Sequence, residues 1–397
     1  MFNPGLYLKK VTAEDFRSIR RAEVAFAPGL NIIIGKNGAG KTSFLKIIDD
    51  VLADGGDIEL QFSKRTAVVQ GQNEYLASFS PNPDFKSVER YHRPKFEYQV
   101  DGNKFWDPAS EIVNINDLIE KYESSFLVHN FLTHGLPGTL VFFNQELKGA
   151  VLLKDPGLIS SHEIIRLFRE NQNNAKDTLV HYLQASILFS FGIDNSPLKV
   201  ESPISIQEFA GRVNASVDDM ADVLTHSLSG LTSIEKVRVN DTLKVQGSRA
   251  TKLELPNLLF EFLSEGYWHK FSELSDGTQR IVYLVSQIRS LFAMDNVSAL
   301  YLLEEPELGI HPHQLRKLMD FLKEQAETKQ IILTTHSPQV LDILGPDDLD
   351  RIILCEYDNV NGTQLRHMTD KEKEQAQSYL KDMFLSDFWR FTDFNSK

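Results

Sequence analysis

A short segment near the start of the chain carries residues that bind phosphate groups in many nucleotide-binding proteins. Gly35-Lys-Asn-Gly-Ala-Gly-Lys41-Thr42 fits the pattern G-x-x-x-x-G-K-[ST] without a mismatch. The glycines let backbone N–H groups converge on phosphates, Lys41 can bridge the β- and γ-phosphates, and the Thr42 hydroxyl can bind Mg²⁺. We therefore predict that ATP and Mg²⁺ bind here. The residues expected to contact the nucleotide are Gly35, Asn37, Gly38, Gly40, Lys41, Thr42 and Ser43.

The sequence on either side of this segment predicts the elements that would position it. The apolar run Leu30-Asn-Ile-Ile-Ile34 is typical of a central parallel strand. Between Thr42 and Leu52 the apolar residues recur at helical spacing, which predicts a helix whose N-terminus faces the phosphates. A flexible glycine turn is the alternative. The order strand, glycine loop, helix favours nucleotide binding.

Two adjacent acids follow a second apolar run. Leu300-Tyr-Leu-Leu-Glu304-Glu305-Pro306 resembles a Walker B strand, which delivers two acids to its carboxyl end. The resemblance implies that Glu304, where the family more often has Asp, holds Mg²⁺ through water, and that Glu305 polarises the attacking water as general base. Two carboxylates on a solvated loop are the alternative, and the apolar strand before them disfavours it.

A third apolar run, Ile331-Ile-Leu333, ends in Thr334-Thr-His336-Ser337. A histidine at the carboxyl end of a buried strand can sense the γ-phosphate and orient the attacking water. A lone histidine is more often structural. The two acids and the phosphate loop elsewhere in the chain favour a catalytic role for His336.

The heptapeptide Leu274-Ser-Asp-Gly-Thr-Gln-Arg280 opens a predicted helix with apolar residues at helical spacing. Ser275 is a suitable N-cap, and Gly277 permits a phosphate to approach closely. Alone, the segment would suggest an ordinary N-cap. After the phosphate loop and before the two acids and His336, it resembles the signature motif of ABC-type ATPase heads. The resemblance implies that Ser275 and Gly277 bind the γ-phosphate held by a second copy, so that two heads enclose ATP as a homodimer.

Other segments narrow the resemblance to RecF/SMC-type heads. Asp15-Phe-Arg17-Ser-Ile19 and Pro28-Gly-Leu-Asn31 resemble the opening of these heads, and Glu305-Pro-Glu-Leu-Gly-Ile-His-Pro312 matches the "EPE…HP" run of OLD-like ATPases, a loop that would touch the partner head. The resemblance makes Arg17 a candidate nucleotide contact, with a surface salt bridge as the alternative. The glutamine expected to reach Mg²⁺ is Gln145, with Gln70 and Gln72 as alternatives.

Composition and charge limit the class of protein. The chain has 397 residues, a formal net charge of −13 and one cysteine. The charge argues against indiscriminate nucleic-acid binding without excluding a local basic groove. Cys355 follows an apolar run and is expected to be buried, in a reducing cytosol. No apolar run approaches the roughly 20 residues of a membrane helix, and the N-terminus does not resemble a signal peptide, so we expect a cytoplasmic protein without membrane contact.

We predict an α/β fold, an ABC-type P-loop ATPase head with an antiparallel β subdomain, an inserted compact helical lobe and no long coiled coil. The predicted domains are an N-terminal ATPase lobe over 1–150, the helical lobe over 151–235 and a C-terminal ATPase lobe over 236–397. Short β-branched runs predict a meandering antiparallel sheet between residues 57 and 147, and further strands at 237–239 and 243–245.

The resemblance also implies a biological role. A head of this size resembles the ATPase subunits of bacterial antiphage systems such as PARIS, Septu and some retrons, which act with a separately encoded nuclease or toxin effector. The stretch after His336 is expected to be too short for the TOPRIM nuclease of OLD-type proteins. We expect a sensor or regulator ATPase triggered by a phage protein or DNA. One alternative is a RecF-like DNA-repair clamp. The other is a transporter ATPase, and the Asp276-containing motif disfavours the transporter.

Overall fold

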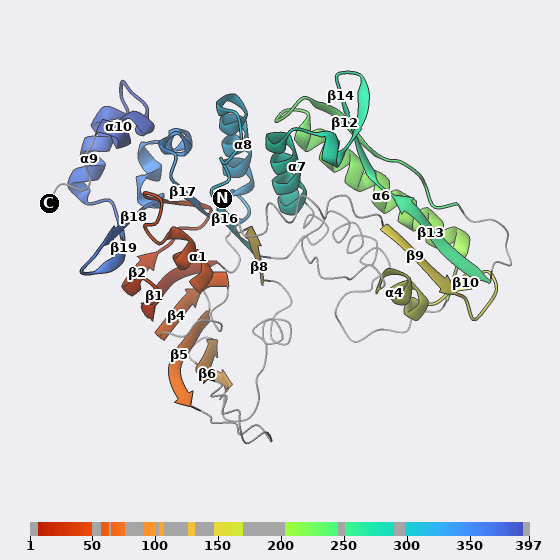
Figure 1. Cartoon of the computed structure of the whole chain (residues 1–397), viewed down its shortest axis with the longest axis horizontal. Helices are drawn as coiled ribbons and strands as arrows, with labels where there is room; N and C mark the ends of the chain where they lie inside the picture. Colours follow the sequence, from red (N-terminus) through yellow and green to blue (C-terminus); the bar gives the residue numbers. More distant parts are fainter. Residues whose placement is uncertain are drawn as a thin grey trace, which may run out of the picture. The chain divides into compact units, whose positions relative to one another are not determined.

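The structure is a computed structural model (Figure 1). It describes residues 7–49, 57–62, 65–75, 90–100, 103–106, 126–131, 147–169, 203–244, 251–289 and 298–391. Their contacts divide the chain into two compact units. The units are Met1–Leu132 with Asn296–Glu307 and Met319–Lys397, and Thr133–Asp295 with Leu308–Leu318. These boundaries differ from 1–150, 151–235 and 236–397, and the three-domain division stays a prediction.

The first unit is built on a twelve-stranded mixed sheet with the order β7-β6-β5-β4-β1-β2-β19-β18-β3-β17-β16-β8. The strands are β1 (Leu8–Phe16), β2 (Ile19–Ala25), β3 (Leu30–Ile34), β4 (Asp57–Phe62), β5 (Arg65–Tyr75), β6 (Arg90–Val100), β7 (Asn103–Trp106), β8 (Phe126–Phe131), β16 (Ser298–Glu304), β17 (Gln330–Thr335), β18 (Ile352–Asp358) and β19 (Gly362–His367). Neighbours from β18 to β8 are parallel, and the remaining pairs are antiparallel.

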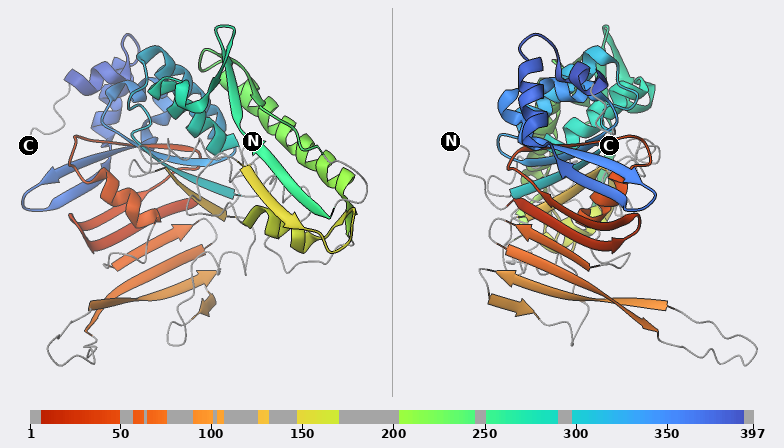
Figure 2. Two further views of the ribbon diagram at one scale, coloured as in Figure 1. Left: turned by 45° about the vertical axis from the view of Figure 1, so that its right-hand side comes forward. Right: turned by 90° about the vertical axis from the view of Figure 1, so that its left-hand side faces the viewer.

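The antiparallel sheet predicted between residues 57 and 147 is confirmed for β4 to β7, which continue from β1 as successive strands (Figure 2). The prediction is wrong for β8, which pairs with β16 in parallel. The pairing direction of a strand depends on its partner, and the partner of β8 lies far along the chain. Its own short sequence therefore gives no signal of direction.

The core of the first unit explains why the apolar runs form strands. Every residue of β3 and of β17 is buried, as expected of parallel strands covered on both faces. Helix α1 (Lys41–Asp49) packs on the sheet through Phe44, whose ring lies 6.2 Å from that of Phe26. Cys355 is 2% exposed, which confirms the prediction that it is buried.

Helices and turns after β16 complete the C-terminal part of the chain. They are α8 (Pro312–Gln325), η3 (Pro338–Ile343), η4 (Pro346–Arg351), α9 (Asp370–Tyr379) and α10 (Leu385–Phe391). Leu385 and Phe388 are buried, and Ser386 donates from its backbone N–H and its hydroxyl to the Asp342 carboxylate at 2.8 and 2.9 Å. Helix α10 is therefore fixed to η3.

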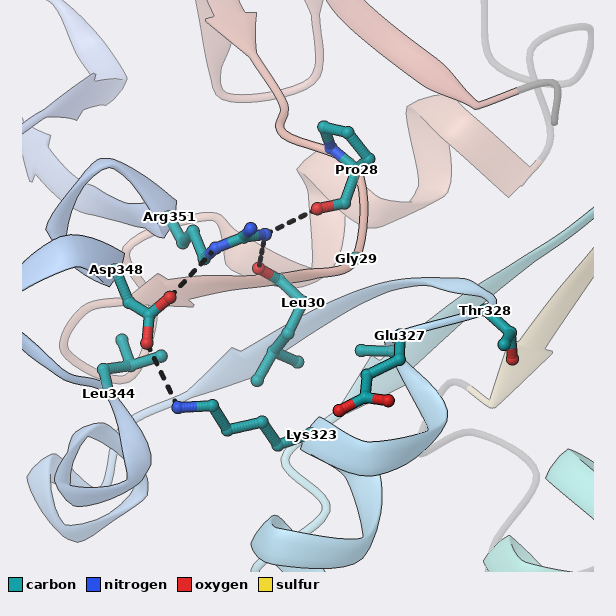
Figure 3. Close-up of a pocket in the computed structure, with 10 residues that line it drawn as sticks. Pro28, Gly29, Leu30, Lys323, Glu327, Thr328, Leu344, Asp348 and Arg351 are labelled. Carbon is teal, nitrogen blue, oxygen red and sulfur yellow. Dashed lines mark hydrogen bonds and ion pairs between the residues drawn. The ribbon is translucent and has the colours of Figure 1, made fainter. Parts of the chain in front are cut away.

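A cavity of about 780 Å³ opens beside the start of β3, at the end of the strand opposite the phosphate loop (Figure 3). Arg351 donates from Nη1 to the carbonyl oxygens of Pro28 and Leu30 at 2.5 and 3.2 Å. Its Nε lies 3.3 Å from Asp348 Oδ1, and Lys323 Nζ lies 3.1 Å from Asp348 Oδ2. The three charged side chains bind one another, and Arg351 also binds the backbone at the start of β3. We therefore interpret Arg351, Asp348 and Lys323 as a clamp that fixes the start of β3.

Replacing Arg351 with Ala is expected to lower the free energy of unfolding by about 2 kcal/mol, because hydrogen bonds to charged groups are the stronger ones. In thermal denaturation, the Tm of the Arg351→Ala protein should be roughly 4 °C lower than that of the wild type. Arg316→Ala, on an exposed face of α8, is the control and should change stability by less than about 0.5 kcal/mol. An unchanged Tm in Arg351→Ala would show that the clamp does not stabilise the fold.

The second unit combines short sheets with helices. Its strands are β9 (Leu147–Leu152), β10 (Leu158–Ile159), β11 (Ile204–Ser205), β12 (Ile234–Val239), β13 (Lys252–Leu258), β14 (Phe260–Ser264) and β15 (Tyr267–Lys270). Its helices are α4 (Ser161–Arg169), α6 (Ile206–Leu228), η1 (Phe271–Glu273) and α7 (Asp276–Arg289). Helix α6, capped by Ser205, packs on β12 and α7. Among the described residues, no helix is long and apolar enough to cross a membrane.

The strand predicted at 243–245 is wrong for its first two residues, Leu243 and Lys244, which have irregular backbone. The side chain of Asn214 on α6 replaces a strand partner. It accepts from the Leu243 N–H at 2.8 Å and donates to the Leu243 carbonyl at 3.1 Å. A side chain 29 positions away thus satisfies the backbone hydrogen-bonding groups of a segment whose sequence is typical of a strand.

Candidate functional site

The phosphate loop connects β3 to α1 and packs closely against residues of β18 and β19. Gly38 and Gly40 have φ of 78° and 103°, a region that favours glycine. A Cβ added at Gly35 would lie 2.1 Å from the Cys355 carbonyl oxygen, and one at Gly40 would lie 2.2 Å from Thr363 Oγ1. The hairpin of β18 and β19 therefore supports the loop. It packs so closely that only glycine fits at positions 35 and 40.

Lys41 is held within the loop that it follows. Its Nζ donates to the carbonyl oxygens of Gly35 and Lys36 at 2.9 and 3.1 Å, and the residue is 5% exposed. The same nitrogen lies 3.7 Å from Glu305 Oε1. A buried ammonium group thus lies between the loop and the acid that directly follows β16, where it can contact a phosphate.

Thr42 and Glu304 form the oxygen-rich part of the site. Thr42 Oγ1 donates to Glu304 Oε1, and Glu304 is 7% exposed. A hydroxyl and a carboxylate are the hard oxygen ligands that Mg²⁺ prefers, so these residues fit the predicted metal. Glu304 replaces the Asp more common at this position, and its longer side chain reaches the Thr42 hydroxyl directly. Bound Mg²⁺ would neutralise phosphate charge here.

Glu305 and His336 meet at the carboxyl ends of β16 and β17. Glu305 Oε1 lies 3.1 Å from His336 Nδ1. The Glu305 N–H donates to the Thr334 carbonyl at 2.8 Å, and Glu305 has a φ of 45°, which is rare for a residue with a side chain. The backbone thus turns sharply where the strand ends and aims the carboxylate at His336.

Glu307 also belongs to this cluster, although no catalytic role was predicted for it. Its Oε1 accepts from Thr335 Oγ1 at 2.5 Å and from the His336 N–H at 3.4 Å, and lies 3.7 Å from His336 Nδ1. Burial raises the pKa of the Glu307 carboxyl, against the hydrogen bond from Thr335. The one sequence signal for a role of Glu307 in the site is its position two residues after Glu305.

Arg17 lies in the turn between β1 and β2, with a φ of 52° and its guanidinium 5.4 Å from the Phe16 ring. The adjacent Ser18 binds Thr363 twice, through the two hydroxyls at 2.8 Å and through the Thr363 N–H and the Ser18 carbonyl at 2.8 Å. Because Thr363 also packs on Gly40, the turn is tied to the phosphate loop. The role of Arg17 toward nucleotide stays a prediction.

The signature segment belongs to the second unit. Ser275 caps α7, accepting from the Thr278 N–H at 3.3 Å, which confirms the predicted N-cap. A Cβ on Gly277 would lie 2.7 Å from the Gly309 carbonyl oxygen, so the segment packs against the loop that follows the two acids. The roles of Ser275 and Gly277 toward a nucleotide stay predictions. Gln145 lies outside the described residues, as do the side chains of Gln70 and Gln72.

A comparison with known protein families identifies the family of this chain. A family model described as "AAA domain, putative AbiEii toxin, Type IV TA system" matches residues 30–342. The chain belongs to this AAA family. The matched range of this AAA-family chain includes the phosphate loop, the signature segment, both acids and His336.

The AAA-family chain is also similar to DNA replication and repair protein RecF. It is 34% identical over 102 residues to RecF of Shewanella sp. (strain W3-18-1), which is 24% of this chain and 28% of that protein. It is 30% identical over 129 residues to RecF of Caldanaerobacter subterraneus subsp. tengcongensis, 32% of each. The chain thus spans about a third of the length of these relatives or less.

Two solved structures show the fold of the AAA-family chain. One is an SMC head bound to the C-winged helix domain of ScpA, with a TM-score of 0.53 and 12% identity over 93% of this chain and 99% of that one. The other is a Pyrococcus furiosus SMC head with an extended coiled coil, bound to the C-terminal domain of ScpA, with a TM-score of 0.53 and 11% identity over 95% and 100%. The predicted fold, an α/β P-loop head of the RecF/SMC type, is confirmed.

Proposed function

We propose that this protein binds and hydrolyses ATP as an ABC-type ATPase head. One observation carries the proposal. Three segments far apart in the sequence bring Lys41, the Thr42–Glu304 pair and the Glu305–His336 pair to the carboxyl ends of neighbouring parallel strands. A cation for phosphate, oxygen ligands for Mg²⁺ and a base paired with an imidazole are the groups that phosphoryl transfer to water needs.

Each group has a defined task in this mechanism. The loop N–H groups and Lys41 bind the phosphates, and Thr42 and Glu304 would hold Mg²⁺, which would neutralise phosphate charge. Glu305 accepts a proton from the attacking water as that water approaches the γ-phosphorus. His336, 3.1 Å from Glu305, orients the carboxylate and detects the γ-phosphate. Catalysis then depends on positioning and charge, since the protein forms no covalent bond to the substrate.

We also propose that ATP drives dimerisation. Ser275 and Gly277 lie at the N-terminus of α7, where backbone N–H groups can bind a phosphate. A second copy would present its own γ-phosphate to them, as in other ABC-type heads. The loop containing Gly309 packs on Gly277 and would lie in the same interface. Loss of the γ-phosphate would remove the contact that favours the closed dimer, so that hydrolysis opens it.

Light scattering after size-exclusion chromatography tests this switch. Glu305→Gln protein with ATP and Mg²⁺ is expected to double in mass relative to the nucleotide-free sample, because bound ATP is not consumed. Lys41→Ala, combined with Glu305→Gln, should remove the increase by removing nucleotide. Ser275→Arg should remove it while ATP still binds, since the arginine blocks the second copy. A mass that does not respond to ATP would contradict the switch.

For the biological role, we propose a cytoplasmic sensor or regulator subunit of an antiphage defence system, which controls a separate nuclease or toxin effector. The family description names a toxin of a type IV TA system, and the similar SMC heads carry a bound protein partner; both support regulation of another protein. Co-expression with the proteins of neighbouring open reading frames tests this role. The expected result is a complex whose nuclease or toxin activity changes in Lys41→Ala.

A second candidate is a RecF-like DNA clamp, supported by the identity to RecF proteins. A clamp requires ATP-dependent binding of duplex DNA, although the net charge of −13 requires any basic surface to be local. Gel-shift titration of a duplex with Glu305→Gln protein distinguishes the candidates. Binding that requires ATP and weakens steeply with salt would favour the clamp over the effector-linked regulator.

A further inference from the structure

Glu307 occupies an unusual place for a carboxyl group. The residue is 8% exposed, and its carboxyl group contacts the end of β17 that carries His336. One oxygen, Oε1, accepts from the Thr335 hydroxyl and from the His336 N–H. The other, Oε2, is buried and has no hydrogen-bond partner in the described part of the chain. A buried oxygen without a partner destabilises the fold, so stability alone does not account for this acid.

We propose that Glu307 is a positioning residue for ATP hydrolysis, which fixes the turn of His336 and through it the carboxylate of Glu305. The inference rests on the proposed ATPase function. Its geometric basis is a chain of contacts: Glu307 holds both Thr335 and the backbone of His336, and the His336 ring lies 3.1 Å from Glu305 Oε1. Glu307 itself touches no reacting atom.

The backbone of Glu305 explains why such a support is needed. Its φ of 45° is a strained conformation for a residue with a Cβ, of the kind that persists only when the surroundings hold it. The N–H of Glu305 is fixed by the Thr334 carbonyl at the end of β17. Glu307 binds the next two residues of the same segment, Thr335 and His336. One carboxyl therefore fixes the strand end that holds both the base and its histidine.

The charge of the cluster suits this division of roles. Burial and the nearby Glu305 both raise the pKa of Glu307, while Thr335 and His336 act in the opposite direction. Of the two carboxyl groups, Glu305 lies nearer to the imidazole: its Oε1 is 3.1 Å from His336 Nδ1, against 3.7 Å for Glu307 Oε1. Glu307 binds the hydroxyl and backbone of the strand end, and Glu305 is the nearer partner of the imidazole.

Four variants test the inference: Glu307→Gln, Glu307→Ala, Thr335→Val and the exposed control Glu327→Gln. Glu307→Ala is expected to lower kcat by about 100-fold with the ATP Kd nearly unchanged, because misplacement of a catalytic group affects the chemical step. Glu307→Gln, which keeps an acceptor oxygen for Thr335 and the His336 N–H, should restore most of kcat. Thr335→Val should lower kcat less than Glu307→Ala, and Glu327→Gln should not change it.

The result that would overturn the inference is a kcat in Glu307→Ala equal to that of the wild type, or a Glu307→Gln protein as impaired as Glu307→Ala. If Glu307→Ala does not fold, Thr335→Val decides, since it removes the hydroxyl that binds both Glu307 and the Ser337 N–H; an unchanged kcat would then refute the role. The ring signals of His336 in NMR spectra provide a readout without hydrolysis. They should shift in Glu307→Ala or Thr335→Val even if the wild type binds ATP without hydrolysing it, an outcome that would refute the proposed function alone.

Discussion

Glu305→Gln is expected to lower kcat for ATP hydrolysis by about 100- to 10,000-fold, the contribution of a positioned general base. ATP should still bind, because the groups proposed to hold phosphate and metal are Lys41, Thr42 and Glu304, none of which is changed. The amide of glutamine can accept a hydrogen bond from the water but cannot take its proton. It can also keep a contact with His336 Nδ1, now 3.1 Å from Glu305 Oε1.

Steady-state phosphate release and binding of a fluorescent ATP analogue measure the two quantities separately. The matched control is Glu327→Gln, the same change at an exposed carboxylate just after α8. Hydrolysis that survives in Glu305→Gln would show that another group activates the water. The double variant with His336→Asn should be no slower than Glu305→Gln alone, since both residues are proposed to act on the same proton transfer.

Gly40→Ala is expected to abolish nucleotide binding, with a loss of affinity greater than about 100-fold, or roughly 3 kcal/mol. The new methyl group would lie 2.2 Å from Thr363 Oγ1 and 2.6 Å from Thr363 Cγ2. These contacts are too close to keep, and a φ of 103° is itself unfavourable for alanine. Gly40 would have to move, and it directly precedes Lys41.

Calorimetric titration with ATP measures this loss. Gly38→Ala is the control for a methyl group added elsewhere in the same loop, because Gly38 also has a positive φ but no protein atom lies within 4 Å of an added Cβ. Combining Gly40→Ala with Thr363→Ala should recover part of the affinity by making room for the methyl group. If Thr363→Ala recovers no affinity in the Gly40→Ala protein, the contact with Thr363 has no special importance.

The local parts of the site could be predicted from sequence. A fully buried strand leaves a continuous apolar run, and both β3 and β17 show one before their polar ends. The glycine loop, the two acids and the N-cap at Ser275 are likewise local patterns, because each depends on residues a few positions apart. The order of these motifs was enough to predict the α/β head.

The contacts that support the site could not be predicted in the same way. Thr363 and Cys355 pack beneath the phosphate loop from a hairpin more than 300 positions away, and neither residue type marks such a role. The sequence around Glu307 is typical of an interface loop, whereas its contacts with Thr335 and His336 place it in the Glu305–His336 cluster. These features depend on which strands become neighbours, and a single sequence does not encode that locally.

If the protein binds ATP as proposed, the packing of the β18–β19 hairpin against the phosphate loop would determine when binding first becomes possible during synthesis. Cys355, which donates to the Ala39 carbonyl, is made 316 positions later, and the ribosome needs on the order of tens of seconds to add these residues. A nascent chain or truncated fragment therefore has the phosphate motif without the hairpin that shapes it. Since a ligand stabilises only the state that binds it, cellular ATP would stabilise finished molecules and leave incomplete ones open to proteolysis.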